Sequence, residues 1–112
     1  MTTNASRKAR GMRTQKVVAE AFKEAGWPHA ETAGAGRPGT DVLGIAGVDV
    51  EVKARRGFNV VAAMKQARER AADGTLCVAV IRPDGMGETT INDWPAIVRL
   101  QDLTRLMKAA GY

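Results

Sequence analysis

The sequence predicts a single small α/β domain in which helices flank a mixed central β-sheet. Its 112 residues are too few for two separate cores, and a composition of 45% hydrophobic and 26% charged residues is that of an ordinary globular chain. Segments with the helical apolar period of about 3.6 residues alternate with segments of strand pattern. The composition rules out a mainly disordered or fibrous chain, and no apolar run approaches the roughly 18 residues of a membrane helix.

The first half of the chain predicts a helix followed by a hairpin. Apolar residues recur on one face of residues 11–25, and Gly26 ends this helix. Short strands are expected over 30–33 and, after a glycine-rich loop, over 41–45. Residues 48–54 alternate strictly between valines and charged residues, so we expect a half-buried strand that pairs with 41–45.

The second half predicts two more helices and a buried strand. Asn59 is placed to cap a helix over 60–72, and the continuous apolar run 76–81 is typical of a buried strand. Residues 88–100 indicate one or two edge strands broken by a Trp-Pro pair. A closing helix is expected over 102–110, with its apolar side chains facing inward: Leu103, Leu106, Met107 and Ala110.

Positive charge is concentrated at the N-terminus. The chain has 17 Lys and Arg residues against 12 Asp and Glu, a net charge of +5, and residues 1–16 contain no acidic residue. We expect residues 1–10 to form a flexible basic arm ahead of a domain over 11–112. Such an arm favours a polyanion, most often nucleic acid, with a solubilising tail as the alternative. The basic residues of this region are Arg7, Lys8, Arg10, Arg13 and Lys16.

Two further signals exclude other classes of protein. The single cysteine, Cys77, excludes an internal disulfide framework and fits a reducing cytoplasm, and one cysteine with one histidine cannot build a structural zinc site. Residues 34–39 match the letters of a G-x-G-x-x-G dinucleotide-binding loop, which needs a strand before it and a helix after it. Here a strand follows where that loop needs a helix, and the predicted helix lies upstream, so nucleotide binding is not expected.

Charged residues on the two hairpin strands carry the candidate chemistry. Asp41 opens the first strand, and Glu51 and Lys53 share one face of the second. Neighbouring strands lie about 5 Å apart, so the two carboxylates can converge, and they repel each other unless a cation joins them. With the Val52 carbonyl as a further oxygen ligand, this set suits Mg²⁺ or Mn²⁺. The alternative is an ordinary solvated strand face.

The order of these residues resembles the PD-(D/E)XK nuclease superfamily, above all its small Holliday junction resolvase branch, which includes phage and archaeal members. The resemblance covers residues 7–82 and rests on Gly39-Thr40-Asp41-Val42, on Val50-Glu51-Val52-Lys53 and on the helix carrying Gln66. It implies a restriction-endonuclease-like fold in which Asp41 and Glu51 bind the metal and Lys53 serves the attacking water. Thr40 stands where the family's nominal signature has a proline.

The resemblance also implies a residue from the first helix, where the family often has Glu or Gln. Gln15 is the matching position, with Glu20 as the alternative, and a Gln would hold any second metal more weakly because it lacks charge. Residues 32–40 contain no serine to match the loop serine of archaeal resolvases. Charge and position, in turn, predict contacts with DNA phosphates for Arg7, Lys8, Arg10, Arg13, Lys16, Arg37, Arg55, Arg56, Lys65 and Gln66.

The sequence thus predicts a Mg²⁺-dependent DNA endonuclease, with Mn²⁺ as an alternative ion, that cuts four-way junctions or other branched DNA. Resolving a junction takes two symmetric cuts, so we expect a homodimer. The expected location is the cytoplasm of a bacterium or of a phage-infected host cell, away from any membrane. Two alternatives stay open: another nuclease of the superfamily, of the repair, nicking or flap type, and a non-catalytic DNA-binding module of the same fold.

Overall fold

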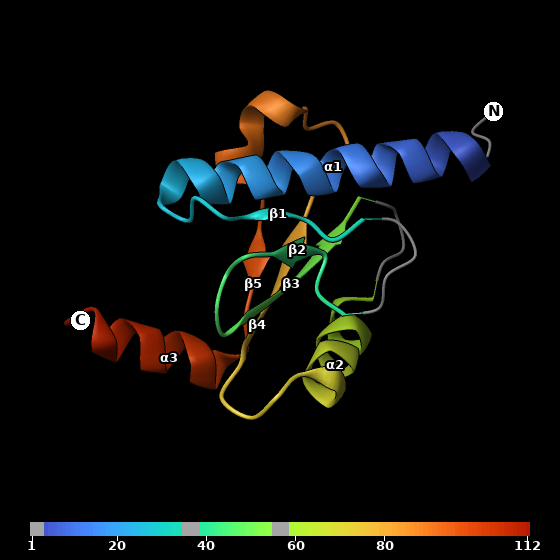
Figure 1. Ribbon diagram of the computed structural model, residues 1–112. Coiled ribbons are helices and arrows are strands. Elements are labelled where there is room, and N and C mark those ends of the chain that lie inside the picture. Colours follow the sequence, from blue (N-terminus) through green and yellow to red (C-terminus); the bar gives the residue numbers. More distant parts are fainter. Residues whose placement is uncertain (1–3, 35–38, 55–58) are drawn as a thin grey trace.

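The computed structural model describes residues 4–34, 39–54 and 59–112, in which a mixed β-sheet lies between helices (Figure 1). The central sheet has the strand order β3-β4-β5. β3 and β4 are parallel, and β5 is antiparallel to β4. These strands are Val48–Lys53, Leu76–Ile81 and Ala96–Ile97. The predicted α/β class with a mixed sheet is confirmed.

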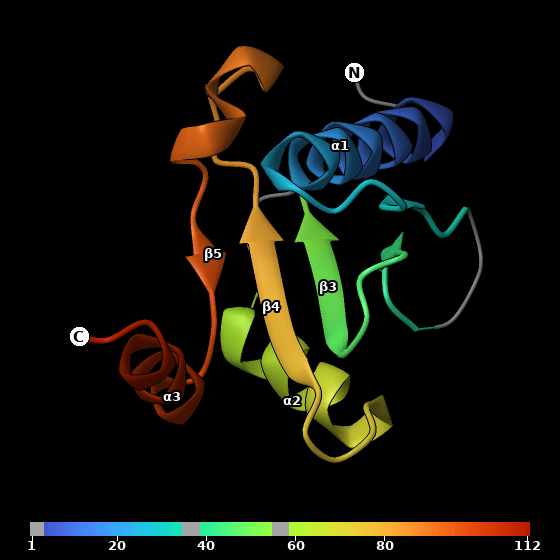
Figure 2. The ribbon, with the colours of Figure 1, turned by 60° about the vertical axis from the view of Figure 1, so that its left-hand side comes forward.

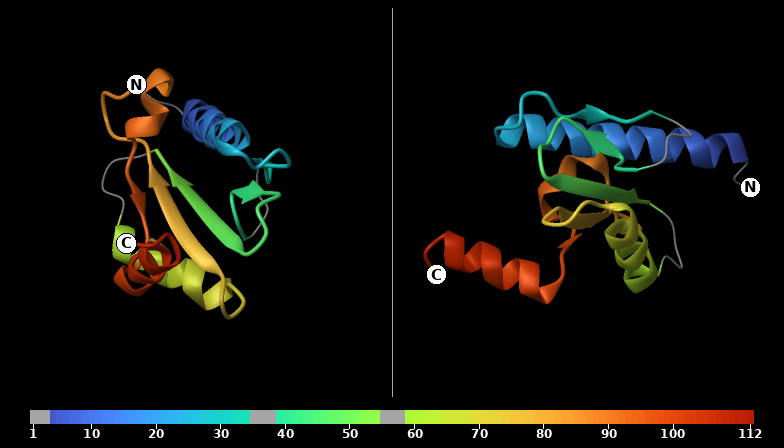
Figure 3. Two further views of the ribbon diagram at one scale, coloured as in Figure 1. Left: turned by 90° about the vertical axis from the view of Figure 1, so that its left-hand side faces the viewer. Right: turned by 60° about the horizontal axis from the view of Figure 1, so that its bottom comes forward.

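Helices cover both faces of this sheet (Figures 2 and 3). α1 lies on one face, and α2 and α3 lie on the other. The bounds of the three helices are Asn4–Ala25, Val60–Arg70 and Leu100–Ala109. Among the residues that the structure describes, no helix is long and apolar enough to cross a membrane.

The alternation of β3 decides which face of the sheet is apolar. Val50 and Val52 are buried against Val18 of α1 in the larger core cluster. Burying such a side chain stabilises the fold by about 1.5–3 kcal/mol, so these valines contribute substantially to stability. The charged residues of β3 therefore face α2, beside a smaller cluster that contains Met64 and Cys77. Cys77 is fully buried, as a core residue should be, and burial raises the pKa of its thiol.

α1 is longer than the sequence analysis predicts, because it begins at Asn4 instead of residue 11. The segment expected to be a flexible arm is, from Asn4 to Arg10, the first part of this helix, and residues 5–10 are exposed. The reason is local: this segment has no Gly or Pro and is rich in Ala, Arg and Lys, which have high helix propensity. The predicted end is confirmed, with Gly26 at φ +122° and its amide donating to the Lys23 carbonyl at 3.1 Å.

The predicted hairpin between 41–45 and 48–54 does not form, because the strands of these two segments belong to different sheets. β2, which spans only Val42–Leu43, pairs instead with β1, Glu31–Thr32, in the place where a strand over 30–33 is predicted. The contact between β2 and β3 is made just before β2, where the Asp41 amide donates to the Val50 carbonyl at 2.7 Å. The hairpin prediction was wrong in its pairing because single-sequence patterns do not show which neighbour a short strand selects.

A close backbone approach explains why β2 is so short. Gly44, immediately after β2, adopts φ +85°, and a Cβ at this position would lie 1.9 Å from the carbonyl oxygen of His29. Only glycine has both the left-handed conformation and the space that this crossing needs. The chain therefore leaves β2 after two residues and returns towards β3.

The central part of the chain follows the predictions closely. The Asn59 side chain accepts a hydrogen bond from the Ala62 amide at 3.0 Å and so caps α2. α2 ends at Arg70, two residues before the predicted end, and β4 has the predicted bounds. These elements were predictable because capping and apolar runs are local signals.

The segment 88–100, predicted as edge strands, instead begins as a 3₁₀ helix, η1, over Glu88–Asp93. The Thr90 hydroxyl donates to the Gly87 carbonyl at 2.7 Å, a local bond that competes with a strand ladder. Only Ala96–Ile97 forms an edge strand. Trp94 between them is 6% exposed and lies under the Arg82 guanidinium, 5.6 Å from the ring centroid.

The inward orientation predicted for the closing helix is wrong. The buried residue of α3 is Asp102, 1% exposed, whose carboxylate accepts hydrogen bonds from Arg99 and Arg105, each at 3.1 Å. Helical periodicity predicted the helix but cannot show whether anything covers its apolar face. Four large apolar side chains of α3 are 42–75% exposed: Leu100, Leu103, Leu106 and Met107.

Candidate metal centre

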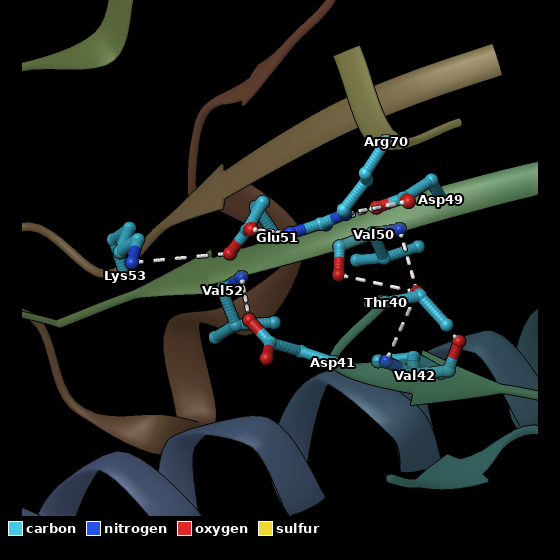
Figure 4. Close-up of polar contacts among 9 residues, drawn as sticks. All are labelled: Thr40, Asp41, Val42, Asp49, Val50, Glu51, Val52, Lys53 and Arg70. Atoms are coloured by element: carbon cyan, nitrogen blue, oxygen red, sulfur yellow. Dashed lines mark hydrogen bonds and ion pairs between the residues drawn. The ribbon is translucent and has the colours of Figure 1, made fainter. Parts of the chain in front are cut away.

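Two acidic side chains lie close together beside β3, Asp41 at its outer edge and Glu51 on the face turned towards α2 (Figure 4). Asp41 directly precedes β2, and its Oδ2 accepts a hydrogen bond from the Val52 amide at 2.8 Å. Glu51 lies on β3 and is turned towards α2. A strand residue points its N–H and C=O to the same side, so the Val52 carbonyl also faces the edge occupied by Asp41. The site therefore brings together the two carboxylates and the carbonyl that the sequence analysis singled out.

Thr40 holds Asp41 at this edge. Its hydroxyl oxygen accepts a hydrogen bond from the Val50 amide at 2.8 Å and lies 2.9 Å from the Val42 carbonyl, to which it can donate. A proline has neither a hydroxyl nor an amide hydrogen and could not make these contacts. Thr40 stands where the nominal signature has a proline. Its hydroxyl makes hydrogen bonds to the backbone that a regular ladder between the two segments would otherwise provide.

Burial and a neighbouring charge act together on Asp41. Its pKa is raised from 3.8 to about 6. Burial is the largest cause, the hydrogen bond from the Val52 amide opposes it, and the Glu51 carboxylate raises the pKa further. Two carboxylates in one partly buried place resist joint ionisation until a cation joins them. A divalent cation bound between the two carboxylates would offset their mutual repulsion.

Glu51 lies between two cationic side chains and is 8% exposed. Its Oε1 accepts a hydrogen bond from Nη1 of Arg70 at 2.6 Å. Lys53 Nζ lies 3.8 Å from Oε2, and the Lys53 side chain remains 31% exposed. Lys53 therefore stands beside Glu51 on the predicted face, with access to solvent.

Arg70 and Asp49 belong to the site, although no sequence motif predicts a role for either residue. Arg70, the last residue of α2, also donates from Nε to Oδ2 of Asp49 at 3.0 Å, and this bond is the main cause that raises the pKa of Arg70. The alternation of β3 places Asp49 on the same face as Glu51. Arg70 lies one helical turn after Gln66, and this spacing places both residues on one side of the helix. Periodicity cannot show which turn of a helix crosses a strand, so the contact with β3 was not predicted.

Gln15 lies on α1, next to a residue that is linked to the end of β3 through Arg82. The Lys53 carbonyl accepts a hydrogen bond from the Arg82 amide at 2.8 Å, and the Arg82 guanidinium donates to the Thr14 hydroxyl at 3.2 Å. The half-buried Gln15 follows Thr14 directly. Glu20, the alternative, lines a groove between α1 and η1, to which Ile91 of η1 also contributes.

The residues predicted to contact DNA fall into three groups. The five cations of α1 are exposed. The first turns of this helix extend past the end of β3 (Figures 1 and 3). Arg13 is also hydrogen-bonded to Glu88 at 2.9 Å. Lys65 and Gln66 are exposed on α2. Three others lie outside the described residues: Arg37, Arg55 and Arg56.

The donor set fits a hard divalent ion. Within residues 4–34, 39–54 and 59–112, no three side chains of Asp, Glu, His or Cys gather to hold a metal. The groups beside β3 that could hold an ion are the carboxylates of Asp41 and Glu51 and the Val52 carbonyl, all of them oxygen donors. Mg²⁺ is commonly bound through only one or two carboxylates, with water and substrate phosphate completing its shell. Two carboxylates and a carbonyl suffice for such an ion.

Comparison with known proteins adds no relative. No protein family, no curated protein and no solved structure matches the chain. The geometry and chemistry of its own residues are therefore the basis for assigning a function.

Proposed function

We propose that the protein is a Mg²⁺-dependent endonuclease with a restriction-endonuclease-like fold that hydrolyses phosphodiester bonds in DNA. The observation that carries this proposal is the convergence of Asp41 and Glu51 beside Lys53 at one edge of β3. The α/β architecture also supports it: a helix, a short strand pair, β3, a crossover helix and the parallel β4 follow one another and bring the acidic residues together.

Each residue of the site has a role in such a reaction. Asp41, Glu51 and the Val52 carbonyl would hold the ion, which when bound polarises a phosphate oxygen and lowers the pKa of a water molecule. The Val52 amide and the Arg70 guanidinium hold the two carboxylates in place. The Lys53 ammonium can donate a hydrogen bond to the attacking oxygen or to the phosphate and stabilise the growing negative charge.

Branched DNA is the substrate class we propose, with the four-way junction first. The exposed cations of α1 and the net charge of +5 favour binding to phosphates of any sequence. A chain of 112 residues is small for a junction, and two symmetric cuts require two sites, so the active species would be a homodimer.

The test is cleavage of a labelled four-way junction and of a matched linear duplex, each with Mg²⁺ or with EDTA. We expect nicks in the junction only with Mg²⁺. Asp41→Asn and Glu51→Gln should abolish cleavage but retain or strengthen DNA binding, because each removes a metal ligand and a charge that repels phosphate. Asp73→Asn changes an exposed acid outside the site and should cut like the wild type. Near-normal cleavage by both site variants would contradict the metal centre.

The same assay separates the alternatives. Equal cutting of junction and duplex would favour another nuclease of the superfamily, of the repair, nicking or flap type. DNA binding with no cleavage in Mg²⁺ or Mn²⁺ would favour a non-catalytic module. Sedimentation of the protein with the junction should give two protomers per junction, and one protomer would contradict the proposed dimer.

A further inference from the structure

Arg70 connects the last turn of α2 to two acids on β3 (Figure 4). Nη1 donates to Glu51 Oε1 at 2.6 Å, Nε donates to Asp49 Oδ2 at 3.0 Å, and Nη2 donates to the other Asp49 oxygen. The guanidinium is planar and its donors have fixed directions, so the three bonds hold both carboxylates in one arrangement. The Arg70 side chain is 29% exposed and each carboxylate side chain 11%, so solvent screens these bonds only in part.

These bonds decide which oxygen of Glu51 can serve a cation. Arg70 occupies Oε1, and Oε2 is the oxygen turned towards Lys53. Without Arg70, the Glu51 side chain would lose its fixed orientation and would be repelled by the neighbouring Asp41 and Asp49. Arg70 therefore both orients Glu51 and offsets the negative charge around it.

Asp49 has a different role from Glu51, although both lie on one face of β3. Arg70 holds both oxygens of Asp49 in a bidentate pair, but only one oxygen of Glu51. Asp49 is thus committed to the guanidinium, and it fixes the direction in which Arg70 reaches Glu51. Ligating carboxylates commonly depend on such outer-sphere partners for their orientation.

We propose that Arg70, anchored by Asp49, is a positioning residue that presents Glu51 to the metal ion. This inference rests on the proposed function for the assignment of Glu51 as a ligand. A competing explanation of the same contacts is that Arg70 takes the place of the cation and must leave before it binds. The two explanations predict opposite effects on metal affinity when Arg70 is removed.

The test is a titration of the DNA-free protein with Mn²⁺, in which electron paramagnetic resonance measures the free ion. Loss of an outer-sphere partner costs about 10–100-fold in metal affinity, so Arg70→Met should raise the Kd for Mn²⁺ by at least about tenfold. Arg70→Lys should restore only part of the affinity, because one ammonium cannot reproduce the bidentate bridge. Arg68→Met removes the same charge from the same helix and is the matched control, expected to bind like the wild type.

The anchoring role of Asp49 is tested by a double-mutant cycle. Asp49→Asn should weaken Mn²⁺ binding, and the double variant with Arg70→Met should bind no more weakly than Arg70→Met alone, because Asp49 acts through Arg70. Additive losses would overturn the anchoring role. Unchanged or tighter binding in Arg70→Met would overturn the positioning role and favour competition with the cation.

Failure of this inference is distinguishable from failure of the proposed function. If the wild type binds Mn²⁺ and Asp41→Asn does not, the metal centre stands whatever Arg70→Met does. If the wild type fails to bind Mn²⁺, or Asp41→Asn binds as well as the wild type, the centre itself is refuted. Circular dichroism checks folding, and should Arg70→Met unfold, Asp49→Asn and Arg70→Lys decide the question by the same titration.

Discussion

Asp41→Asn should stabilise the metal-free protein near neutral pH while it removes metal binding. The pKa of Asp41 is raised from 3.8 to about 6 in the folded protein, so the folded state holds this proton more tightly than the unfolded chain. Stability is therefore greatest below the unfolded pKa and is lost as the pH rises through about 6. An asparagine retains an acceptor for the Val52 amide and carries no charge, so it avoids this loss.

The pKa shift sets the size of the effect. Each pKa unit corresponds to about 1.4 kcal/mol, so a shift of about two units would cost the wild type about 3 kcal/mol above pH 6. Partial access of solvent to Asp41 screens the charge, and we reduce the expected gain from Asp41→Asn to about 1–2 kcal/mol. For a domain of this size, each kcal/mol raises the melting temperature by about 4 °C.

The assay is urea unfolding of wild type and Asp41→Asn in EDTA, repeated from about pH 4 to about pH 7.5. The difference in unfolding free energy between the two proteins should be near zero at the acid end and grow in favour of the variant up to about pH 6. Added Mg²⁺ should stabilise only the wild type, because the variant lacks a ligand. A variant that is less stable at neutral pH, with a difference that does not change with pH, would refute the reasoning.

Three further changes test other parts of the molecule. Lys53→Met should fold and bind Mn²⁺ but cut at least about 10²-fold more slowly in single turnover; a loss under about threefold would leave Lys53 a surface ion-pair partner worth about 0–1 kcal/mol. Deletion of residues 1–10 removes three cations and should lower the log–log salt slope of DNA binding by about 2.7 units; an unchanged slope would show that these turns of α1 do not contact DNA. Gly44→Ala should cost about 2–5 kcal/mol in urea unfolding, because its Cβ meets the His29 carbonyl in a left-handed conformation. Gly47→Ala, with φ +75° but open space, is the control and should cost only about 1–2 kcal/mol; equal costs would contradict the clash.

The elements that the sequence predicted correctly are those whose signals are local. The Asn59 cap, the alternation of β3 and the apolar run of β4 each lie within a few residues, and no distant contact overrides them. The C-terminal third depends on distant contacts. Its apolar period predicts α3, yet the exposed fraction of Leu106, 43%, depends on what packs against the helix, which periodicity cannot show.

The candidate site follows the same rule: residues that are near one another in the sequence were predicted, and the residue that is distant in the sequence was not. Asp41 and Glu51 are linked by one short connection, so almost any pairing of their segments brings the carboxylates close together. Arg70 follows Glu51 by 19 residues and is the last residue of α2, so its position depends on where that helix crosses the sheet. The prediction therefore included the acids that would hold an ion but missed the cation that orients one of them.

The cations around β3 lie beside the acids on its face, whereas the acid at its outer edge, Asp41, has a pKa raised mainly by burial. Asp49 is neutralised by the bidentate contact with Arg70, and Glu51 lies between Arg70 and Lys53. Asp41 receives an amide hydrogen bond, while Lys53 lowers its pKa less than burial raises it. Arg70 and Lys53 thus compensate the charges of the acids on the face of β3, and the negative charge that remains is that of Asp41 at the edge. A divalent ion bound there would supply the charge that the described side chains leave unbalanced, and this links the raised pKa of Asp41 to the proposed chemistry.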